Sequence, residues 1–124
     1  LIVDDTYNAN IDSFKSGINS FASINSQGRK FLIIGDMKEL GDKTLSYHLK
    51  LGKFINNQKI NFVFGIGSEI KNTISTINNS QIYSKHFENK QELINFLKIE
   101  LRKNDAIYLK ASRSMQFEKI IEKL

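Results

Sequence analysis

The stretch KFLIIG, residues 30–35, decides the fold of this 124-residue chain. Four large apolar side chains follow one another without polar alternation, which is typical of a strand buried on both faces of a parallel sheet. The run FVF at residues 62–64 repeats this pattern within a predicted strand at 60–66. Shorter β-branched runs at residues 1–4, 82–86 and 105–110 complete a set of five predicted strands.

Between the predicted strands, apolar residues recur every three or four positions, which is the period of a helix face. We interpret each such stripe as a core face and expect Gly52 to let its helix approach the sheet closely. The stripes are Ile11, Phe14, Ile18, Phe21; Leu45, Leu49, Gly52; Ile70, Ile74, Ile77; Leu93, Leu97, Leu101; and Phe117, Ile120, Ile121, Leu124. The alternation predicts one α/β domain over residues 1–124, a Rossmann-like, open, mostly parallel sheet of about five to six strands with helices on both faces.

Composition limits the chemistry and the partners. The chain has no Cys and no Pro, so it holds no disulfide, no thiolate nucleophile and no cysteine-ligated metal. We expect His48 to pack on the apolar side of its helix and His86 to lie at the surface. The net charge of +5 comes mostly from dispersed lysines, which indicates a solvated basic surface rather than a nucleic-acid groove. No apolar run approaches the ~20 residues of a membrane span, so we expect neither nucleic acid nor membrane as a partner.

Polar residues gather where the first predicted strand ends, and ligands of open α/β sheets bind beyond the carboxyl ends of the strands. The segment DDTYNAN, residues 4–10, follows this strand. Its Asp5, Thr6 and Asn8 side chains can accept hydrogen bonds from a sugar, a base or an amine, and Asn10 suits the N-cap of the next helix. The alternative is a capped turn whose carboxylates are solvated.

Three more strand ends carry candidate turns. GDMKELG, residues 35–41, places acids between two glycines, and KASRS, residues 110–114, combines two cations with two hydroxyls. The second group suits a phosphate or a carboxylate, because Arg binds such groups bidentately and Lys supplies a point charge. The alternative for the first group is a βα loop with glycine at a positive φ, and for the second it is an ordinary solvated turn. Gly65-Ile66-Gly67 lacks the third glycine of a dinucleotide fingerprint, so we interpret it as a structural turn.

Taken in order, these motifs resemble the signatures of the F-type Mur ligases. DDTYNAN is similar to D-[ST]-Y-N-A-N-P, GDMKELG to G-D-M-x-E-L-G, and KASRSM to K-[GA]-S-R-x-M. His48 and Gly52 fall where the family shows H-x-x-x-G. The resemblance covers essentially the whole chain. It departs at Ile11, where the family carries Pro, and at Ala111, where the family often carries Gly.

The resemblance implies the C-terminal domain of a three-domain enzyme, and the start of the chain inside a predicted strand leads us to expect that it was cut from a longer protein. The implied enzyme uses ATP to convert the terminal carboxylate of UDP-N-acetylmuramoyl-tripeptide into an acyl phosphate, which the amine of D-Ala-D-Ala attacks. This reaction belongs to peptidoglycan precursor synthesis in the cytoplasm. ATP and Mg²⁺ would be bound mainly by the central domain, so the partners are the chain's own N-terminal and central domains, in a monomer.

The resemblance also implies roles for individual residues. Contacts to ATP would come from the first and last motifs, with Asp5 at the ribose and Asn8 at the adenine or ribose edge: Asp5, Thr6, Asn8 and Ser112. The implied catalytic cations, facing the phosphates or the dipeptide carboxylate, are Lys110 and Arg113. The implied substrate-binding residues are Asp36, Glu39 and Asn10. No metal ligand is expected in this domain.

Two other interpretations stay open. Another ligase of the Mur or folylpolyglutamate type would add a different amino acid. A phospho-acceptor receiver domain would also carry paired acids after its first strand, as Asp4 and Asp5 do here, and a Lys after its fifth, as Lys110 does. A receiver also needs an acceptor Asp at the end of the third strand, where this chain has residues 65–67, and Pro after the Lys, where it has Ala111.

Overall fold

A computed structural model of the chain describes residues 1–5 and 10–124. The described strands are β1 (Ile2–Asp4), β2 (Lys30–Gly35), β3 (Phe62–Ile66), β4 (Tyr83–Phe87) and β5 (Ala106–Lys110). The described helices are α1 (Ile11–Ser23), α2 (Thr44–Ile55), α3 (Ile70–Thr76), α4 (Lys90–Glu100) and α5 (Glu118–Ile121), with short 3₁₀ turns η1 (Gly41–Lys43) and η2 (Arg113–Met115). Strand and helix alternate as predicted, and β2 has the predicted bounds.

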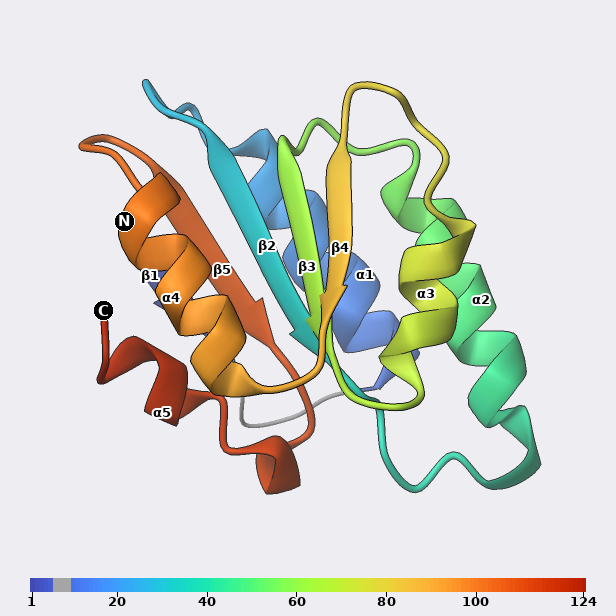
Figure 1. The fold of residues 1–124 in the computed structure, drawn as a ribbon. Helices are drawn as coiled ribbons and strands as arrows, with labels where there is room; N and C mark the ends of the chain where they lie inside the picture. The colour runs from blue at the N-terminus through green and yellow to red at the C-terminus, as the bar shows by residue number, and fades with distance from the viewer. Residues whose placement is uncertain (6–9) are drawn as a thin grey trace.

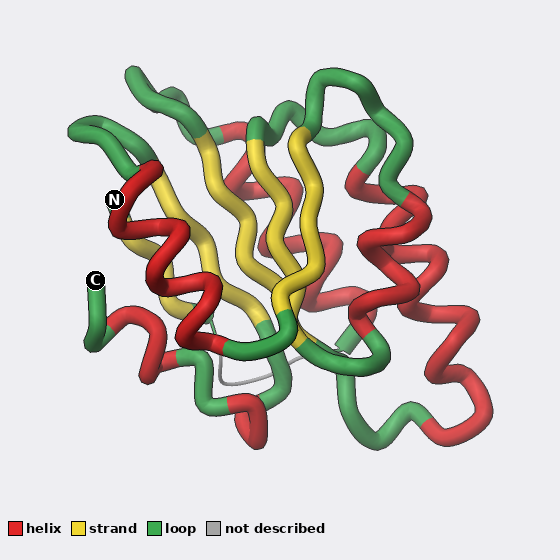
Figure 2. Tube along the Cα trace, viewed as in Figure 1, coloured by secondary structure: helices red, strands yellow, loops and turns green. Residues whose placement is uncertain are grey.

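All five described strands run parallel in one sheet of order β1-β5-β2-β3-β4. Figure 1 shows that α1, α2 and α3 cover one face of this sheet and that α4 and α5 lie on the other. The trace in Figure 2 shows the same two helical layers with the sheet between them. The predicted open α/β fold is therefore confirmed.

Strand β2 explains why its sequence shows no polar alternation. Leu32 and Ile34 lie in the core under α1 and α2, whereas Phe31 and Ile33 lie in the core under α4 and α5. All four side chains are fully buried. Because successive strand residues point to opposite faces, a strand covered on both sides must be apolar at every position.

Helix α2 differs from its predicted packing. It buries His48, Leu51, Gly52 and Ile55, whereas Leu45 is 54% exposed, so the predicted stripe was rotated about the helix axis. The prediction that Gly52 faces the sheet was wrong. A Cβ at this position would lie 2.6 Å from the carbonyl oxygen of Thr73 in α3, because α2 packs side by side with α3.

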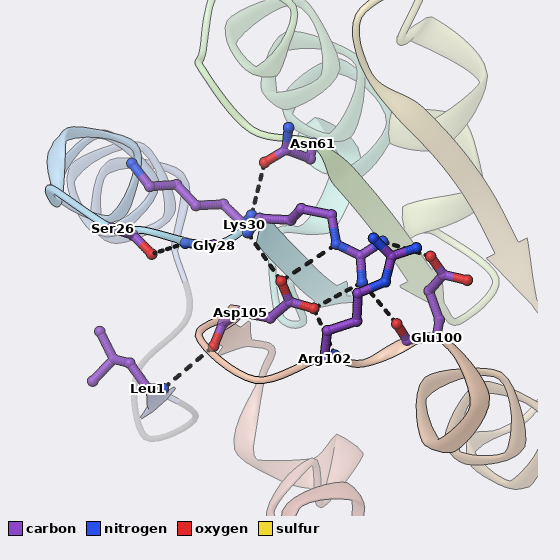
Figure 3. A network of polar contacts seen from close by, with 9 residues as sticks. Leu1, Ser26, Gly28, Lys30, Asn61, Glu100, Arg102 and Asp105 are labelled. Atoms are coloured by element: carbon purple, nitrogen blue, oxygen red, sulfur yellow. Dashed lines mark hydrogen bonds and ion pairs between the residues drawn. The ribbon is translucent and has the colours of Figure 1, made fainter.

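A polar network ties the amino end of the sheet together, as Figure 3 shows for Asp105, Arg102 and Glu100. The Asp105 carboxylate accepts hydrogen bonds from the backbone N–H of Arg29 and of Arg102 and from two guanidinium N–H groups of Arg29. Burial works against the charge on Asp105, but these hydrogen bonds together lower its pKa. Arg29 also bonds Glu100 at 2.6 Å, so β2, α4 and β5 are joined here.

Within residues 1–5 and 10–124, none of the helices has the length and apolar character that crossing a membrane requires.

Candidate functional site

The carboxyl ends of β1, β5 and β2 lie side by side, because β5 sits between the other two strands. Asp5 follows β1, Lys110 ends β5 and Asp36 follows β2. The three motifs singled out in the sequence therefore meet at one edge of the sheet. This edge is where ligands of open α/β sheets bind.

Asp5 and Lys110 form the centre of this edge. The ammonium nitrogen of Lys110 lies 2.9 Å from Oδ2 of Asp5, and the Lys110 side chain is 2% exposed against 40% for Asp5. The Tyr108 hydroxyl donates to the same oxygen at 2.5 Å. A buried ammonium needs such a partner, because leaving it unpaired carries a large desolvation cost. In this structure Lys110 therefore orients Asp5, and its predicted contact with a phosphate or carboxylate stays a prediction.

Tyr108 is a residue of this site that the sequence analysis did not single out. Burial, together with its hydrogen bond to the Asp5 carboxylate, raises the pKa of the Tyr108 phenol. The phenol therefore stays protonated at neutral pH and acts as a donor. The sequence could have indicated Tyr108 through its spacing from Lys110, since residues two apart on a strand point to the same face of the sheet. Tyr108 and Asp5 also line an open pocket of about 330 Å³ between β1 and α1.

Asp36 is buried rather than turned toward solvent, with 1% exposure. Its Oδ1 accepts hydrogen bonds from the backbone N–H groups of Glu69 at 3.0 Å and Ile70 at 2.7 Å. Its Oδ2 lies 3.3 Å from the ammonium nitrogen of Lys38. The carboxylate thus satisfies N–H donors at the start of α3 and holds this end of the helix to β2. Its predicted contact with substrate is untested, and in this conformation the side chain has a packing role.

Gly67 makes room for that carboxylate. Its φ is +127°, and a Cβ here would lie 2.3 Å from Oδ1 of Asp36. Both observations require glycine, since other residues rarely adopt such a φ. The interpretation of Gly65-Ile66-Gly67 as a structural turn was only partly right, because Gly65 and Ile66 still belong to β3 and the chain turns from Gly67 onward.

The second and third motifs are joined by hydrogen bonds. The backbone N–H of Ser112 donates to the carbonyl oxygen of Asp36 at 3.1 Å, and the backbone N–H of Lys38 donates to the Ser112 hydroxyl at 2.9 Å. From the other side, His48 accepts from the backbone N–H of Met37 through Nε2 and contacts the carbonyl oxygen of Thr44 through Nδ1. The loop after β2 is therefore fixed by the segment after β5 and by α2. The prediction that His48 is a satisfied packing residue is confirmed.

The remaining predicted residues divide by position. Asn10 caps α1, accepting a hydrogen bond from the backbone N–H of Ser13 at 2.9 Å, as predicted. Glu39 and Arg113 are exposed, and Glu39 has a positive φ of 62°. His86 is half-buried and within 2.8 Å of the carbonyl oxygen of Gly67, so its predicted surface position was only partly right. Thr6 and Asn8 lie outside the described residues.

The part of the chain that the structure describes holds no group of three or more His, Cys, Asp or Glu side chains able to bind a metal ion.

Comparison with known proteins decides the family. The domain family described as "Mur ligase, glutamate ligase domain" matches residues 1–113. The chain belongs to the Mur ligase family. Among curated proteins, this Mur ligase domain is similar to two UDP-N-acetylmuramoyl-tripeptide–D-alanyl-D-alanine ligases. The ligase of Buchnera aphidicola is 38% identical over all of this chain and 26% of that protein. The ligase of Haemophilus influenzae is 34% identical over all of this chain and 27% of that protein.

Solved structures agree with this assignment. The domain is similar to MurF ligase from Thermotoga maritima in complex with ADP, with a TM-score of 0.79 and 29% identity over 98% of this chain and 27% of that chain. It shares the fold of MurF from Acinetobacter baumannii, with a TM-score of 0.82 at 24% identity. The chain thus spans about a quarter of the length of the relatives it matches. The family match replaces the receiver-domain alternative, and the sheet order also differs from the 2-1-3-4-5 order of receiver-type folds.

Proposed function

We propose that this Mur ligase domain is the C-terminal part of an ATP-dependent amide ligase that adds D-Ala-D-Ala to UDP-N-acetylmuramoyl-tripeptide. The main support is that the described residues of the three motifs, which begin at Asp4, Gly35 and Lys110, meet at one edge of the sheet. The chain is also similar to relatives that carry this ligase name. The N-terminal and central domains of the same polypeptide would be its partners, in a monomeric protein of the cytoplasm.

The proposed reaction forms an amide bond in two steps. An oxygen of the tripeptide carboxylate attacks the γ-phosphorus of ATP, ADP leaves, and an acyl phosphate forms. The amine nitrogen of D-Ala-D-Ala then attacks the acyl carbon, inorganic phosphate leaves, and the nitrogen loses a proton. Holding the three substrates together removes much of the entropic barrier, and positioned cations stabilise the charge that develops in both steps.

In this reaction, residues of this chain would bind the substrates and orient them. Asp5 is 40% exposed and can accept hydrogen bonds from ribose hydroxyls. Thr6 and Asn8, which lie outside the described residues, would add further contacts to the nucleotide. Arg113 is exposed and Ser112 is half-buried, and in this proposal both would meet a phosphate or the dipeptide carboxylate. Lys110 would act by holding Asp5, because its ammonium group is buried against that carboxylate.

The second motif would shape the cleft around the dipeptide. Glu39 is exposed and can attract the ammonium group of D-Ala-D-Ala. Asp36 would keep the surrounding loop in place through its bonds to α3, and Asn10 would do the same for the start of α1. Closure of the domain onto its neighbours would complete the site. Mg²⁺ would be held mainly by the central domain.

A second candidate function is that of a Mur-type ligase adding a single amino acid. It is favoured by the description of the family as a glutamate ligase domain. The two candidates differ in the nucleophile that the protein accepts.

The test uses the full-length protein and measures phosphate release with ATP, the UDP-linked tripeptide and each nucleophile in turn. Turnover with D-Ala-D-Ala, and none with D-Glu or a diamino acid, is expected. Turnover with a single amino acid in its place would contradict the first candidate. Arg113→Ala should lower kcat/KM for ATP or for the dipeptide, whereas Arg102→Ala, an exposed arginine at the opposite edge of the sheet, should leave both unchanged. The isolated 124 residues should show no turnover.

A further inference from the structure

Helix α1 carries Gly17 where Tyr108 of β5 approaches it. A Cβ at Gly17 would lie 1.8 Å from the Tyr108 hydroxyl oxygen, 2.8 Å from Cζ of the same ring and 3.3 Å from Oδ2 of Asp5. Glycine inside a helix is destabilising relative to alanine. The close approach of the phenol explains why glycine occurs at position 17, since the side chain of any other residue would push Tyr108 away from Asp5.

The hydrogen bonds at Asp5 converge on one oxygen. Among residues 1–5 and 10–124, the two side-chain partners of this carboxylate, Tyr108 and Lys110, both contact Oδ2. The side chain is nevertheless 40% exposed. The carboxylate is therefore held from the protein side at Oδ2 and keeps an accessible face at the edge of the sheet.

The two donors differ in how well they define an orientation. Lys110 carries its charge on a flexible four-carbon stem, and an ammonium group accepts many partner geometries. Tyr108 donates from a rigid ring that is 2% exposed and packs against Phe21 with ring centroids 5.4 Å apart. Lys110 supplies the charge that stabilises Asp5, whereas Tyr108 fixes the direction in which the Asp5 carboxylate points.

We propose that Tyr108 is a positioning residue, which Gly17 admits to the site and which sets the orientation of the Asp5 carboxylate that meets ATP. This inference rests on the proposed function, because it takes the nucleotide as the ligand of Asp5. The segment after β1 gains a fixed starting point, since the backbone N–H of Asp5 is also bonded to the carbonyl oxygen of Leu109 in β5 at 3.0 Å.

The first test is Tyr108→Phe in the full-length enzyme, which removes one oxygen and keeps the ring. We expect the KM for ATP and the Kd for ADP to rise roughly fivefold while kcat stays within about twofold, which is the pattern of lost binding without lost chemistry. The KM for D-Ala-D-Ala should not change. Tyr83→Phe is the matched control, because Tyr83 is 51% exposed at the far edge of the sheet, and it should change none of these constants.

The second test is a double-mutant cycle that separates positioning from general destabilisation. Gly17→Ala in the full-length enzyme should raise the KM for ATP at least as much as Tyr108→Phe does. In a Tyr108→Leu background, where the hydroxyl is gone, Gly17→Ala should add nothing. Equal effects of Gly17→Ala in both backgrounds would overturn the inference.

The inference is also overturned if Tyr108→Phe leaves the ATP and ADP constants unchanged, or raises the KM of all three substrates alike. Absence of ligase turnover in the wild-type protein contradicts the proposed function instead. Melting temperatures of each variant accompany the kinetics, so that a loss of folded protein, which lowers kcat without changing KM, is recognised.

Discussion

Replacing Asp105 by Asn tests the network at the amino end of the sheet most directly. Each carboxylate oxygen of Asp105 accepts one backbone N–H and one guanidinium N–H: Oδ1 from Arg29 N and Nε, and Oδ2 from Arg102 N and Arg29 Nη2. An asparagine keeps one oxygen and turns the other into an NH₂ group. Whichever way the amide is placed, two N–H donors then face another donor.

The expected loss of stability follows from the number of hydrogen bonds that the substitution removes. An unpaired buried N–H and a lost hydrogen bond to a charged group each cost on the order of 1–3 kcal/mol, so we expect Asp105→Asn to reduce the free energy of unfolding by about 3 kcal/mol. With a urea m-value of about 1.5–3 kcal/mol/M for a domain of this size, the unfolding midpoint should fall by about 1–2 M.

The assay is urea unfolding of the 124-residue chain followed by circular dichroism at neutral pH. Asp42→Asn is the control, since Asp42 is exposed in η1 and surface substitutions usually change stability by less than about 0.5 kcal/mol. If Asp105→Asn and Asp42→Asn unfold at the same urea concentration, the network does not stabilise the fold as argued here.

The pH dependence gives an independent check. Because the folded state lowers the pKa of Asp105, its contribution is complete above the unfolded pKa of about 3.9 and is lost as the pH falls through the folded value. The difference between wild type and Asp105→Asn should therefore be constant from about pH 5 to 7 and shrink below about pH 4. A difference that grows toward acid pH would have the wrong sign.

Three further substitutions have defined outcomes in the same unfolding assay. Gly67→Ala should destabilise the chain by about 2 kcal/mol or more, because its φ of +127° and the nearby Asp36 carboxylate both oppose a Cβ; a neutral result would contradict the described turn. Asn10→Ala removes the N-cap of α1 and should cost about 1 kcal/mol, and Asn57→Ala, beyond the end of α2, should cost less. His48→Leu keeps the apolar packing but leaves the backbone N–H of Met37 without its acceptor, so a loss of about 2 kcal/mol is expected; unchanged stability would show that the loop repacks.

Much of the fold was predictable because its sequence pattern reports directly on burial. The continuous apolar run of β2 and the spacing of Phe14, Ile18 and Phe21 in α1 require no knowledge of neighbours, and these side chains are buried as expected. The rotation of α2 was not predictable in the same way. Leu45 looks like a core residue until the packing of α2 against α3 is known.

The candidate site was predictable in its residues but not in their exposure. The motifs identify Lys110 and Asp36 as charged groups at strand ends, and both are nevertheless buried. Whether such a group meets solvent or another residue depends on which strands are neighbours, and alternation of strand and helix does not specify that β5 lies beside β1. The part played by Tyr108 depends in addition on a glycine in α1, far away along the chain.

The position of β5 in the sheet also has a consequence for folding during synthesis. This strand follows the other four described strands along the chain, yet it pairs with both β1 and β2. Until residues 106–110 emerge, β1 lacks its described partner strand and one hydrogen-bonding edge of β2 stays unpaired. Between the synthesis of β1 and that of β5, the nascent domain therefore exposes unpaired strand edges, which favours aggregation or chaperone binding. A stop codon that removes β5 should leave an insoluble product rather than a smaller folded domain.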